Sequence, residues 1–265
     1  MKRMFLSLVW SLGGLYLVLC AALYLLQSRM LYLGQYTRVE AAETDFELKR
    51  EGLVLRGWRI NPGKPRALLY FGGNAESVQL QRADFARWFP DYTIYLLAYR
   101  GYGASDGAPG ERVLKADALA LFDDLQPHYG QIAALGRSVG TGVALHLAAR
   151  RPIARLALIT PYDSLREVAA AHYPIFPVRL LLRDTFEALA DAAALQIPVL
   201  LLIAREDQVI PPRHAQRLLA AFIRTPITQW LDTDHNTVEQ DARFALALRQ
   251  FFAGLHEHQS SFKLR

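Results

Sequence analysis

Cysteine is almost absent from this chain, and so is any run of charge of one sign. Cys20 is the single cysteine among 265 residues, which excludes an intrachain disulfide framework and a cysteine-rich zinc or iron–sulfur site. The 30 basic and 25 acidic residues leave a net charge of +5, but no basic cluster stands out, so we expect no nucleic-acid partner. Glycine and proline occur at ordinary levels and 52% of the residues are hydrophobic, which excludes a collagen-like or disordered chain. A folded protein of one or two domains remains.

Charged residues are missing altogether from residues 4–28, directly after Lys2 and Arg3. The apolar part of this stretch, residues 4–26, would form a helix about 34 Å long at roughly 1.5 Å per residue. This length exceeds the roughly 30 Å hydrocarbon core of a bilayer. We therefore expect a single-pass membrane anchor over residues 1–28, followed by a connector over residues 29–48.

Two alternatives apply to the same stretch. The small residues Cys20, Ala21 and Ala22 would allow cleavage of a signal peptide, although the apolar region of a signal is usually shorter. Cys20 also stands where a lipoprotein cysteine could, although Leu19 before it is bulkier than the usual small residue. Basic residues on the two flanks are nearly balanced and only slightly favour an N-terminus inside the cytoplasm. In that orientation the rest of the chain lies outside the cytoplasm, which in a bacterium is the periplasm.

The remaining chain alternates short apolar runs with amphipathic, helix-like stretches. Residues 52–60 alternate enough for a strand or a hairpin. Further strand-like runs cover residues 67–71, 93–98, 132–135, 156–160, 199–204 and 227–231. Helical patterns cover residues 77–88, 112–126, 138–150, 212–222 and 238–252. This alternation is typical of βαβ units, so we expect an α/β fold with a mostly parallel sheet of about eight strands, flanked by helices, over residues 49–254.

Two segments fall outside this alternation. Prolines interrupt residues 161–195, which we expect to form a small cap insertion over the sheet. Residues 255–265 are expected to form a polar tail.

Ligands of open parallel sheets bind at the carboxyl ends of the strands, so the residues that follow each run matter most. Residues 136–140 read Gly-Arg-Ser-Val-Gly between a predicted strand and a predicted helix, which is the G-x-S-x-G pattern in its required context. The two glycines remove side chains that would clash in so sharp a turn. Ser138 would then lie at a helix N-terminus, which favours negative charge. We interpret Ser138 as a nucleophile; the alternative is a simple helix N-cap.

A serine nucleophile needs a base, and the base needs a carboxylate that orients it. Asp207 and His235 each follow a predicted strand, and the order Ser138, Asp207, His235 is that of an α/β-hydrolase triad. Other acids also follow strands, namely Asp163, Glu206, Asp232 and Asp234. Among the remaining histidines, we expect His172 to be the one that could line a substrate pocket, together with Tyr162.

An oxyanion hole needs two N–H donors aimed at the developing charge. The backbone of Val139, directly after the nucleophile, would supply one. The backbone of Asn74, in the glycine-rich loop of residues 71–76, would supply the other; the alternative is a tight turn without catalytic duty. Nucleotide binding is not expected, because no complete G-x-G-x-x-G or G-x-x-x-x-G-K-[ST] motif occurs.

Taken as a set, these motifs resemble the α/β-hydrolase superfamily, specifically its serine aminopeptidase-like branch with membrane-anchored ABHD-type members. The matching stretches are residues 70–76 (YFGGNAE), 99–107 (YRGYGASDG), 136–140 (GRSVG), 160–165 (TPYDSL) and 234–236 (DHN). The resemblance covers about residues 45 to 252. It implies a carboxylic-ester-type hydrolase with Ser138 as nucleophile, His235 as base and Asp207 as the orienting acid. The chain departs from the family at Gly72, where the oxyanion loop usually carries a histidine that could hold its shape.

The expected activity is two-step acyl transfer to water, with no metal and no other cofactor, since no H-E-x-x-H-type spacing is present. Proximity to a bilayer would suit lipid-like acyl substrates, either oxygen esters or thioesters. A serine peptidase on the same fold and a non-catalytic scaffold or binding protein are the alternatives. The sequence carries no signal of oligomeric state.

Overall fold

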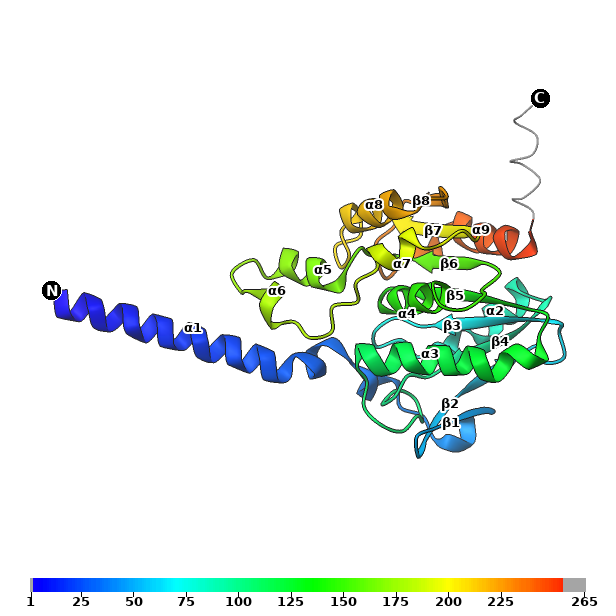
Figure 1. The fold of residues 1–265 in the computed structure, drawn as a ribbon, viewed down its shortest axis with the longest axis horizontal. Coiled ribbons are helices and arrows are strands. Elements are labelled where there is room, and N and C mark those ends of the chain that lie inside the picture. Colours follow the sequence, from blue (N-terminus) through cyan, green and yellow to red (C-terminus); the bar gives the residue numbers. More distant parts are fainter. Residues whose placement is uncertain (1, 255–265) are drawn as a thin grey trace, which may run out of the picture.

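A computed structural model of the protein describes residues 2–254, so the predicted tail at 255–265 lies outside the described residues. A long N-terminal helix, α1 (Lys2–Leu31), extends away from an α/β body that holds the remaining elements (Figure 1). Among residues 2–254, α1 is the one helix long and apolar enough to cross a membrane, a test that a signal sequence would also pass. Cys20 lies within α1.

Eight strands form a single mixed sheet in the order β1-β2-β4-β3-β5-β6-β7-β8. The first two strands pair antiparallel, and β2 pairs antiparallel with β4, whereas every pair from β4 through β8 is parallel. The strands are β1 (Phe46–Arg50), β2 (Leu53–Ile60), β3 (Arg66–Phe71), β4 (Tyr92–Leu97), β5 (Gln131–Arg137), β6 (Leu156–Ile159), β7 (Val199–Ala204) and β8 (Ile227–Leu231). The expected mostly parallel sheet of about eight strands is confirmed.

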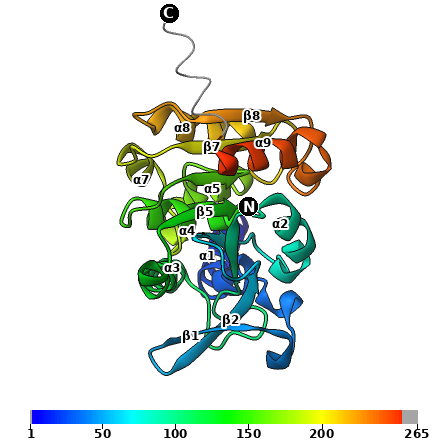
Figure 2. The same cartoon turned by 90° about the vertical axis from the view of Figure 1, so that its right-hand side faces the viewer.

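Helices cover both faces of the sheet, which is why β4 and β7 are buried along their whole length. On one side lie α2 (Arg82–Trp88) and α9 (Ala242–Ala253), and on the other α3 (Glu111–Leu125), α4 (Val139–Ala148), α7 (Leu189–Ala193) and α8 (Pro212–Ala221) (Figure 2). Short 3-10 helices cover Gly34–Thr37, Ala41–Glu43, Val78–Gln81, Gln126–His128 and Val238–Gln240. Two of the predicted helical stretches, 77–88 and 238–252, therefore begin with a 3-10 turn.

The first strand was not among the predicted strands, and its residues 46–48 overlap the stretch interpreted as a connector. In β1 the apolar Phe46 and Leu48 alternate with charged residues, and Leu48 is buried while Glu47 is exposed. Phe46 packs edge-on against Tyr95 of β4, with ring centroids 4.8 Å apart. From its sequence, a five-residue segment with this many charged residues resembles a polar linker. Its antiparallel pairing with β2 identifies it as an edge strand of the sheet.

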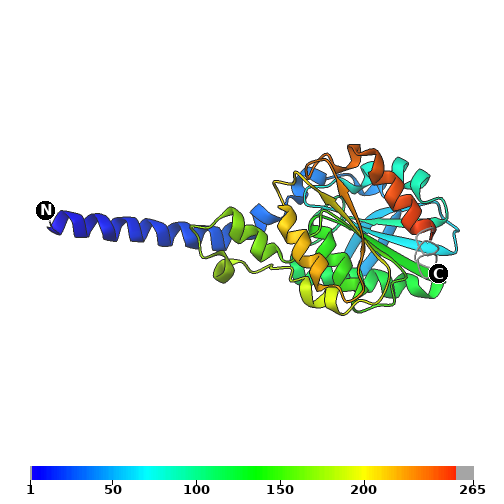
Figure 3. The same ribbon diagram turned by 90° about the horizontal axis from the view of Figure 1, so that it is seen from above.

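Between β6 and β7 the chain leaves the sheet, in the segment expected to form a cap. It holds α5 (Leu165–His172) and α6 (Val178–Leu181) and then α7. In Figures 1 and 3, α5 and α6 lie beside α1 rather than against the sheet. The Ser164 hydroxyl caps α5 by accepting a hydrogen bond from the Glu167 N–H at 3.1 Å.

A buried ion pair holds the loop that follows β4. Arg100 donates from Nε and Nη2 to the two carboxylate oxygens of Asp117 on α3, both at 2.7 Å, and both side chains are buried. A two-point pair of this kind fixes the geometry as well as the charge. It thereby fixes the start of the Gly101-Tyr102-Gly103 segment, which packs beside the candidate site.

Replacing Asp117 by alanine should destabilise the fold strongly, because the buried Arg100 guanidinium then loses both short hydrogen bonds and keeps only Glu51, at 3.5 Å. Breaking a buried pair costs about 3–5 kcal/mol, so thermal unfolding should occur about 10 °C lower in a domain of this size. Asp124→Ala, at an exposed position of the same helix, is the matched control and should move the unfolding temperature little. Equal shifts for the two variants would contradict this role of Asp117.

Candidate active site

The turn between β5 and α4 places Ser138 in a strained backbone conformation. Its φ is 50° and its ψ is −120°, a region that L-residues rarely adopt. Two close approaches explain the glycines around it. A side chain on Gly140 would collide with the carbonyl oxygen of Phe71, and one on Gly136 would collide with the carbonyl oxygen of Gly140. The sequence pattern thus folds as expected, into a sharp strand–turn–helix that raises the Ser138 hydroxyl above the sheet.

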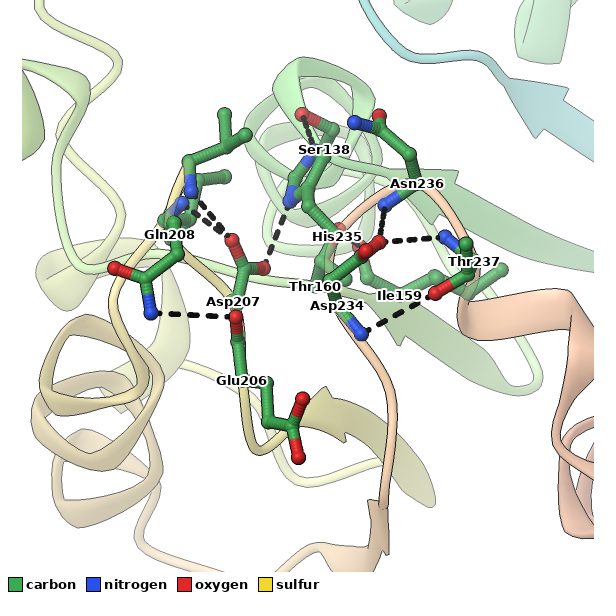
Figure 4. A network of polar contacts seen from close by, with 12 residues as sticks. Ser138, Ile159, Thr160, Glu206, Asp207, Gln208, Asp234, His235, Asn236 and Thr237 are labelled. Carbon is green, nitrogen blue, oxygen red and sulfur yellow. Dashed lines mark hydrogen bonds and ion pairs between the residues drawn. The ribbon is translucent and has the colours of Figure 1, made fainter.

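The three residues predicted to form a triad come together at the carboxyl ends of β5, β7 and β8 (Figure 4). His235 Nε2 lies 3.1 Å from Ser138 Oγ, and His235 Nδ1 lies 2.7 Å from Asp207 Oδ2. Because a carboxylate only accepts, Nδ1 carries the proton and Nε2 accepts from the serine hydroxyl. His235 and Asp207 are both buried.

Local hydrogen bonds hold the two loops that carry the acid and the base. Asp207 Oδ1 accepts from the N–H groups of Val209 at 2.9 Å and Ile210 at 2.6 Å, which leaves Oδ2 free for the imidazole. Asp234, directly before His235, accepts at Oδ1 from the N–H groups of Asn236 and Thr237. The Thr237 side chain, together with these two backbone donors, stabilises the charged form and lowers the pKa of the Asp234 carboxyl below its ordinary value. Asp234 therefore shapes the turn that presents His235.

The other acids that follow strands are engaged elsewhere or lie away from the imidazole. Asp163, the main alternative to Asp207, accepts from His214 Nδ1 at 2.7 Å and from Arg217. Asp232 pairs with Arg205 and Arg243. Glu206 is exposed.

The glycine-rich loop after β3, predicted to supply an oxyanion donor, lies against Ser138. A Cβ added to Gly73 would be 3.5 Å from Ser138 Cβ. The Asn74 side chain is held at Oδ1 by the Leu33 N–H at 3.0 Å and by the Tyr102 hydroxyl at 2.9 Å. Val139, the other predicted donor, is the first residue of α4, where N–H groups have no partner within the helix.

Glu76 lies beside Gly72, the position at which this loop lacks the expected histidine. Its Oε2 accepts from the Gly73 N–H and its Oε1 from the Tyr70 hydroxyl, both at 2.6 Å. A side chain at Gly72 would meet Val78 at 2.6 Å and the Glu76 carboxylate at 3.2 Å. The sequence analysis did not identify Glu76. The available signal was a carboxylate two residues after Asn74, in a loop where glycine replaces the usual histidine at position 72.

Two further charged residues, also missed, connect this loop to the rest of the site. Arg137, which precedes the nucleophile, places Nη1 2.5 Å from Glu239 and 3.8 Å from Glu76. Gln81 Nε2 donates to Glu76 at 3.2 Å and to Glu239 at 3.3 Å. Burial lowers the pKa of Arg137, but the neighbouring charges of Glu76 and Glu239 outweigh it and raise this pKa above its ordinary value. Burial, with the Glu76 charge, raises the pKa of Tyr70 well above its ordinary value.

The two residues proposed to line a substrate pocket have other contacts. Tyr162 is fully buried, and its hydroxyl donates to the Val139 carbonyl at 3.1 Å, so it supports the nucleophile turn from behind. His172, at the exposed end of α5, donates from Nε2 to the Val209 carbonyl at 2.9 Å. It links the cap segment to the loop that carries Asp207.

Comparisons with known proteins agree with this architecture. No protein-family model matches the chain. An uncharacterised protein of Mycobacterium tuberculosis is 37% identical over 183 residues, which are 65% of this chain and 64% of the relative, so the chain spans slightly less than two thirds of that relative's length. Alpha/beta hydrolase domain-containing protein 17B of Xenopus laevis is 32% identical over 204 residues, 74% of this chain and 69% of the relative. The human protein of the same name is 30% identical over 202 residues, 73% and 68% of the two chains.

Solved structures with a similar fold include enzymes that act on esters. An esterase of Pyrococcus furiosus matches with a TM-score of 0.64 and 17% identity, over 79% of this chain and 89% of the esterase. An enol-lactonase of Burkholderia xenovorans matches with a TM-score of 0.62 and 16% identity, over 78% of this chain and 100% of the lactonase. At these identities the likeness concerns the fold, and it confirms the expected α/β-hydrolase fold.

The second buried histidine in this region, His214, should make stability depend on pH. Burial lowers the pKa of His214, since Nε2 has no partner among the described residues and a proton there would be unsatisfied. The unfolded chain then binds the proton first, so stability is lost as the pH falls below the ordinary histidine value of about 6.5. His214→Asn should therefore lose less thermal stability than the wild type between about pH 7.5 and about pH 5.5.

His128→Asn is the control for that measurement, because His128 is exposed. It should follow the wild-type pH profile. A His214→Asn profile that coincides with the wild type would show that His214 does not resist protonation in the folded protein.

Proposed function

The chain belongs to the alpha/beta hydrolase domain-containing protein 17 family, and we propose that it is a membrane-anchored serine hydrolase that cleaves carboxylic ester or thioester bonds. One observation carries this proposal: the hydrogen bonds that run from Ser138 Oγ through the His235 imidazole to Asp207. A hydroxyl that donates to an imidazole held by a buried carboxylate is the arrangement that activates serine toward an acyl carbon.

In the first step, Ser138 Oγ attacks the acyl carbonyl and His235 Nε2 takes its proton. Asp207 stays ionised, keeps the imidazole in the required tautomer and stabilises the imidazolium that forms. The negative charge on the former carbonyl oxygen is held by the N–H groups of Val139 and Asn74, beside the positive end of the α4 dipole. The imidazolium then protonates the leaving alcohol or thiol, and the acyl group remains on Ser138.

In the second step, water replaces the leaving group. His235 accepts a proton from the water as its oxygen attacks the acyl carbon, and the same two N–H groups hold the charge again. The imidazolium returns the proton to Ser138 Oγ as the acyl–oxygen bond breaks, which releases a carboxylic acid. Every group in this cycle belongs to the chain or to solvent.

Membrane anchoring by α1 is the second part of the proposal. The apolar run of residues 4–26 has the length of a span, and its exposed side chains would be costly in water. The end of α1 also leads directly into the site, since the Leu33 N–H binds Asn74. An anchor of this kind is part of the folded unit rather than a loosely attached leader.

Labelling with a fluorophosphonate probe tests the nucleophile. The wild type should be labelled covalently, because the reagent reacts with a hydroxyl activated by a general base, and Ser138→Ala should not. Ser77→Ala is the matched control, since Ser77 lies outside the triad, and it should be labelled like the wild type. Labelling is read out in a gel and the modified residue is identified by peptide mass spectrometry.

Two results would overturn the assignment. Equal labelling of the wild type and Ser138→Ala would place the nucleophile elsewhere. An unreactive but folded wild type would favour the scaffold alternative.

Glu76 should act as a positioning residue for the oxyanion loop. With Glu76→Ala the Gly73 N–H and the Tyr70 hydroxyl lose their acceptor, so the loop no longer holds the Asn74 donor in place. Loss of one donor costs about 100-fold or more in kcat, so misplacement of one should lower kcat about ten-fold or more, with KM changed little. Hydrolysis of a soluble p-nitrophenyl ester gives both constants.

Glu76→Gln keeps one acceptor oxygen for the Gly73 N–H, and its amide nitrogen can donate to the Tyr70 oxygen, so it should recover part of that kcat. Glu47→Ala removes an exposed glutamate from β1 and should leave kcat unchanged. If the loss in Glu76→Ala fell on KM alone, or followed a loss of thermal stability, the role would be structural and the positioning role would be wrong.

A further inference from the structure

The chain returns to α1 in the segment of residues 173–183, which we call the cap hairpin. The Tyr16 hydroxyl donates to the Ile175 carbonyl at 2.8 Å, and the Tyr16 ring stacks on Phe176 with centroids 5.9 Å apart and planes 4° apart. Farther along the helix, Gln27 Nε2 donates to the Leu181 carbonyl at 3.1 Å. The cap hairpin therefore follows α1 from residue 28 back to residue 16.

These contacts lie at membrane depth if α1 spans a bilayer. Tyr16 precedes the end of the apolar run at Leu26 by ten residues, which is about 15 Å along a helix. That distance is about half of a hydrocarbon core of roughly 30 Å. The tip of the cap hairpin, at Ile175 and Phe176, would thus reach close to the middle of the bilayer on the side of the catalytic body.

Several large apolar side chains of the cap hairpin are exposed. Tyr173 is 53% exposed, Ile175 73% and Leu180 85%. Large apolar side chains gathered on a protruding segment mark an interaction surface. The groove between the cap hairpin and α1, about 270 Å³ in volume, is likewise lined mostly by apolar residues, among them Leu23 and Met30.

The backbone of the cap hairpin is suited to surroundings without water. Unsatisfied N–H and C=O groups are costly in lipid. Pro174 and Pro177 have no N–H to satisfy. Donors to carbonyls within the hairpin are the N–H groups of Phe176, Val178, Leu180, Leu181 and Leu182. The Arg183 N–H donates to Gln27 Oε1 at 2.8 Å. The Gln27 side chain of α1 therefore forms hydrogen bonds with backbone groups of the hairpin, and its own amide is hydrogen-bonded as well.

Arg183 lies at the end of the hairpin nearest the body, where the apolar run of α1 also ends. The Arg183 guanidinium stacks on the Tyr24 ring at 5.2 Å and reaches Ser28 Oγ at 3.3 Å. Arg179 turns back to form a two-point ion pair with Glu167 on α5. Arginine and tyrosine side chains at the same depth, followed by apolar residues toward the middle of the bilayer, are the usual arrangement at a membrane interface.

We propose that the cap hairpin is a second membrane element, which lies in the leaflet beside α1 with Ile175 and Leu180 against lipid acyl chains. The inference rests on the proposed anchoring of α1 and is independent of the hydrolytic chemistry. Lipid is the occupant because this surface continues that of α1 at the same depth.

Fluorescence depth measurements on the full chain in lipid vesicles test this proposal. Cys20 is the single cysteine, so Cys20→Ala provides a background for one new cysteine that carries an environment-sensitive NBD label. Ile175→Cys is the test site, Leu17→Cys on α1 reports the anchor, and Leu246→Cys is the matched exposed apolar control on α9. The vesicles contain phosphatidylcholine and phosphatidylglycerol, with a spin-label quencher either on the acyl chain or on the headgroup.

The label at Ile175 should have blue-shifted emission and lose fluorescence to the acyl-chain quencher, as at Leu17, whereas the label at Leu246 should be quenched only by aqueous iodide. An Ile175 label that behaves like Leu246 while Leu17 is quenched would overturn the proposal and leave the anchor intact. A blue shift at Ile175 without lipid quenching would indicate a protein contact, such as a second copy, and would also overturn it.

Absence of quenching at Leu17 would refute the anchor and this inference together. Fluorophosphonate labelling of Ser138 in the same vesicles would still report the proposed hydrolase activity separately. Failure of one proposal is therefore distinguishable from failure of the other.

Discussion

The hydrogen bond between His235 Nδ1 and Asp207 Oδ2 fixes the direction of the imidazole, and the geometry of the site depends on it. It joins the loops after β7 and β8, whose parallel register pairs Ala204 with Leu231 and so ends both strands at the same edge. Because the Nδ1 proton is committed to a buried carboxylate, Nε2 remains an acceptor aimed at Ser138. Ser138 is tied to the same edge, since its N–H donates to the Ile159 carbonyl at the end of β6. Strand order thus brings together groups nearly one hundred residues apart.

A second set of contacts holds the loops that surround the hydrogen bonds between Ser138, His235 and Asp207. The Glu76 carboxylate binds the oxyanion loop at Gly73, and Arg137 lies between Glu76 and Glu239. These residues belong to the three segments that carry the proposed oxyanion donor Asn74, the proposed nucleophile Ser138 and the proposed base His235. Charges of this kind are costly to bury, and their contribution to stability is small or negative unless every partner is present. Their value here is geometric, because a shift of one loop would disturb the partners of the other two.

The sequence predicts what depends on local pattern. Continuous apolar runs predict the parallel strands, and glycines at 136 and 140 predict the sharp turn, because no larger side chain fits beside the Phe71 carbonyl. Order along the chain and position after a strand select Ser138, Asp207 and His235. What escapes prediction depends on partners that are distant in sequence. In the edge strand β1 the alternation is too short to separate a strand from a polar linker, so its assignment depends on the pairing with β2. The role of Glu76 depends on its position beside Gly72. The Asp163–His214 pair likewise joins residues that no motif connects.

The connection between α1 and the oxyanion loop joins the two halves of the proposed function. Leu33, two residues after the end of α1, donates its N–H both to Asn74 Oδ1 and to the Tyr102 hydroxyl. It follows the end of the apolar run at Leu26 by seven residues, which is about 10 Å at helical rise. In the proposed anchored state the oxyanion loop therefore lies close to the lipid headgroups, which extend several ångströms beyond the hydrocarbon core. In that state, the hydrogen bond from the Leu33 N–H to Asn74 Oδ1 would connect the end of the proposed anchor with the proposed oxyanion loop.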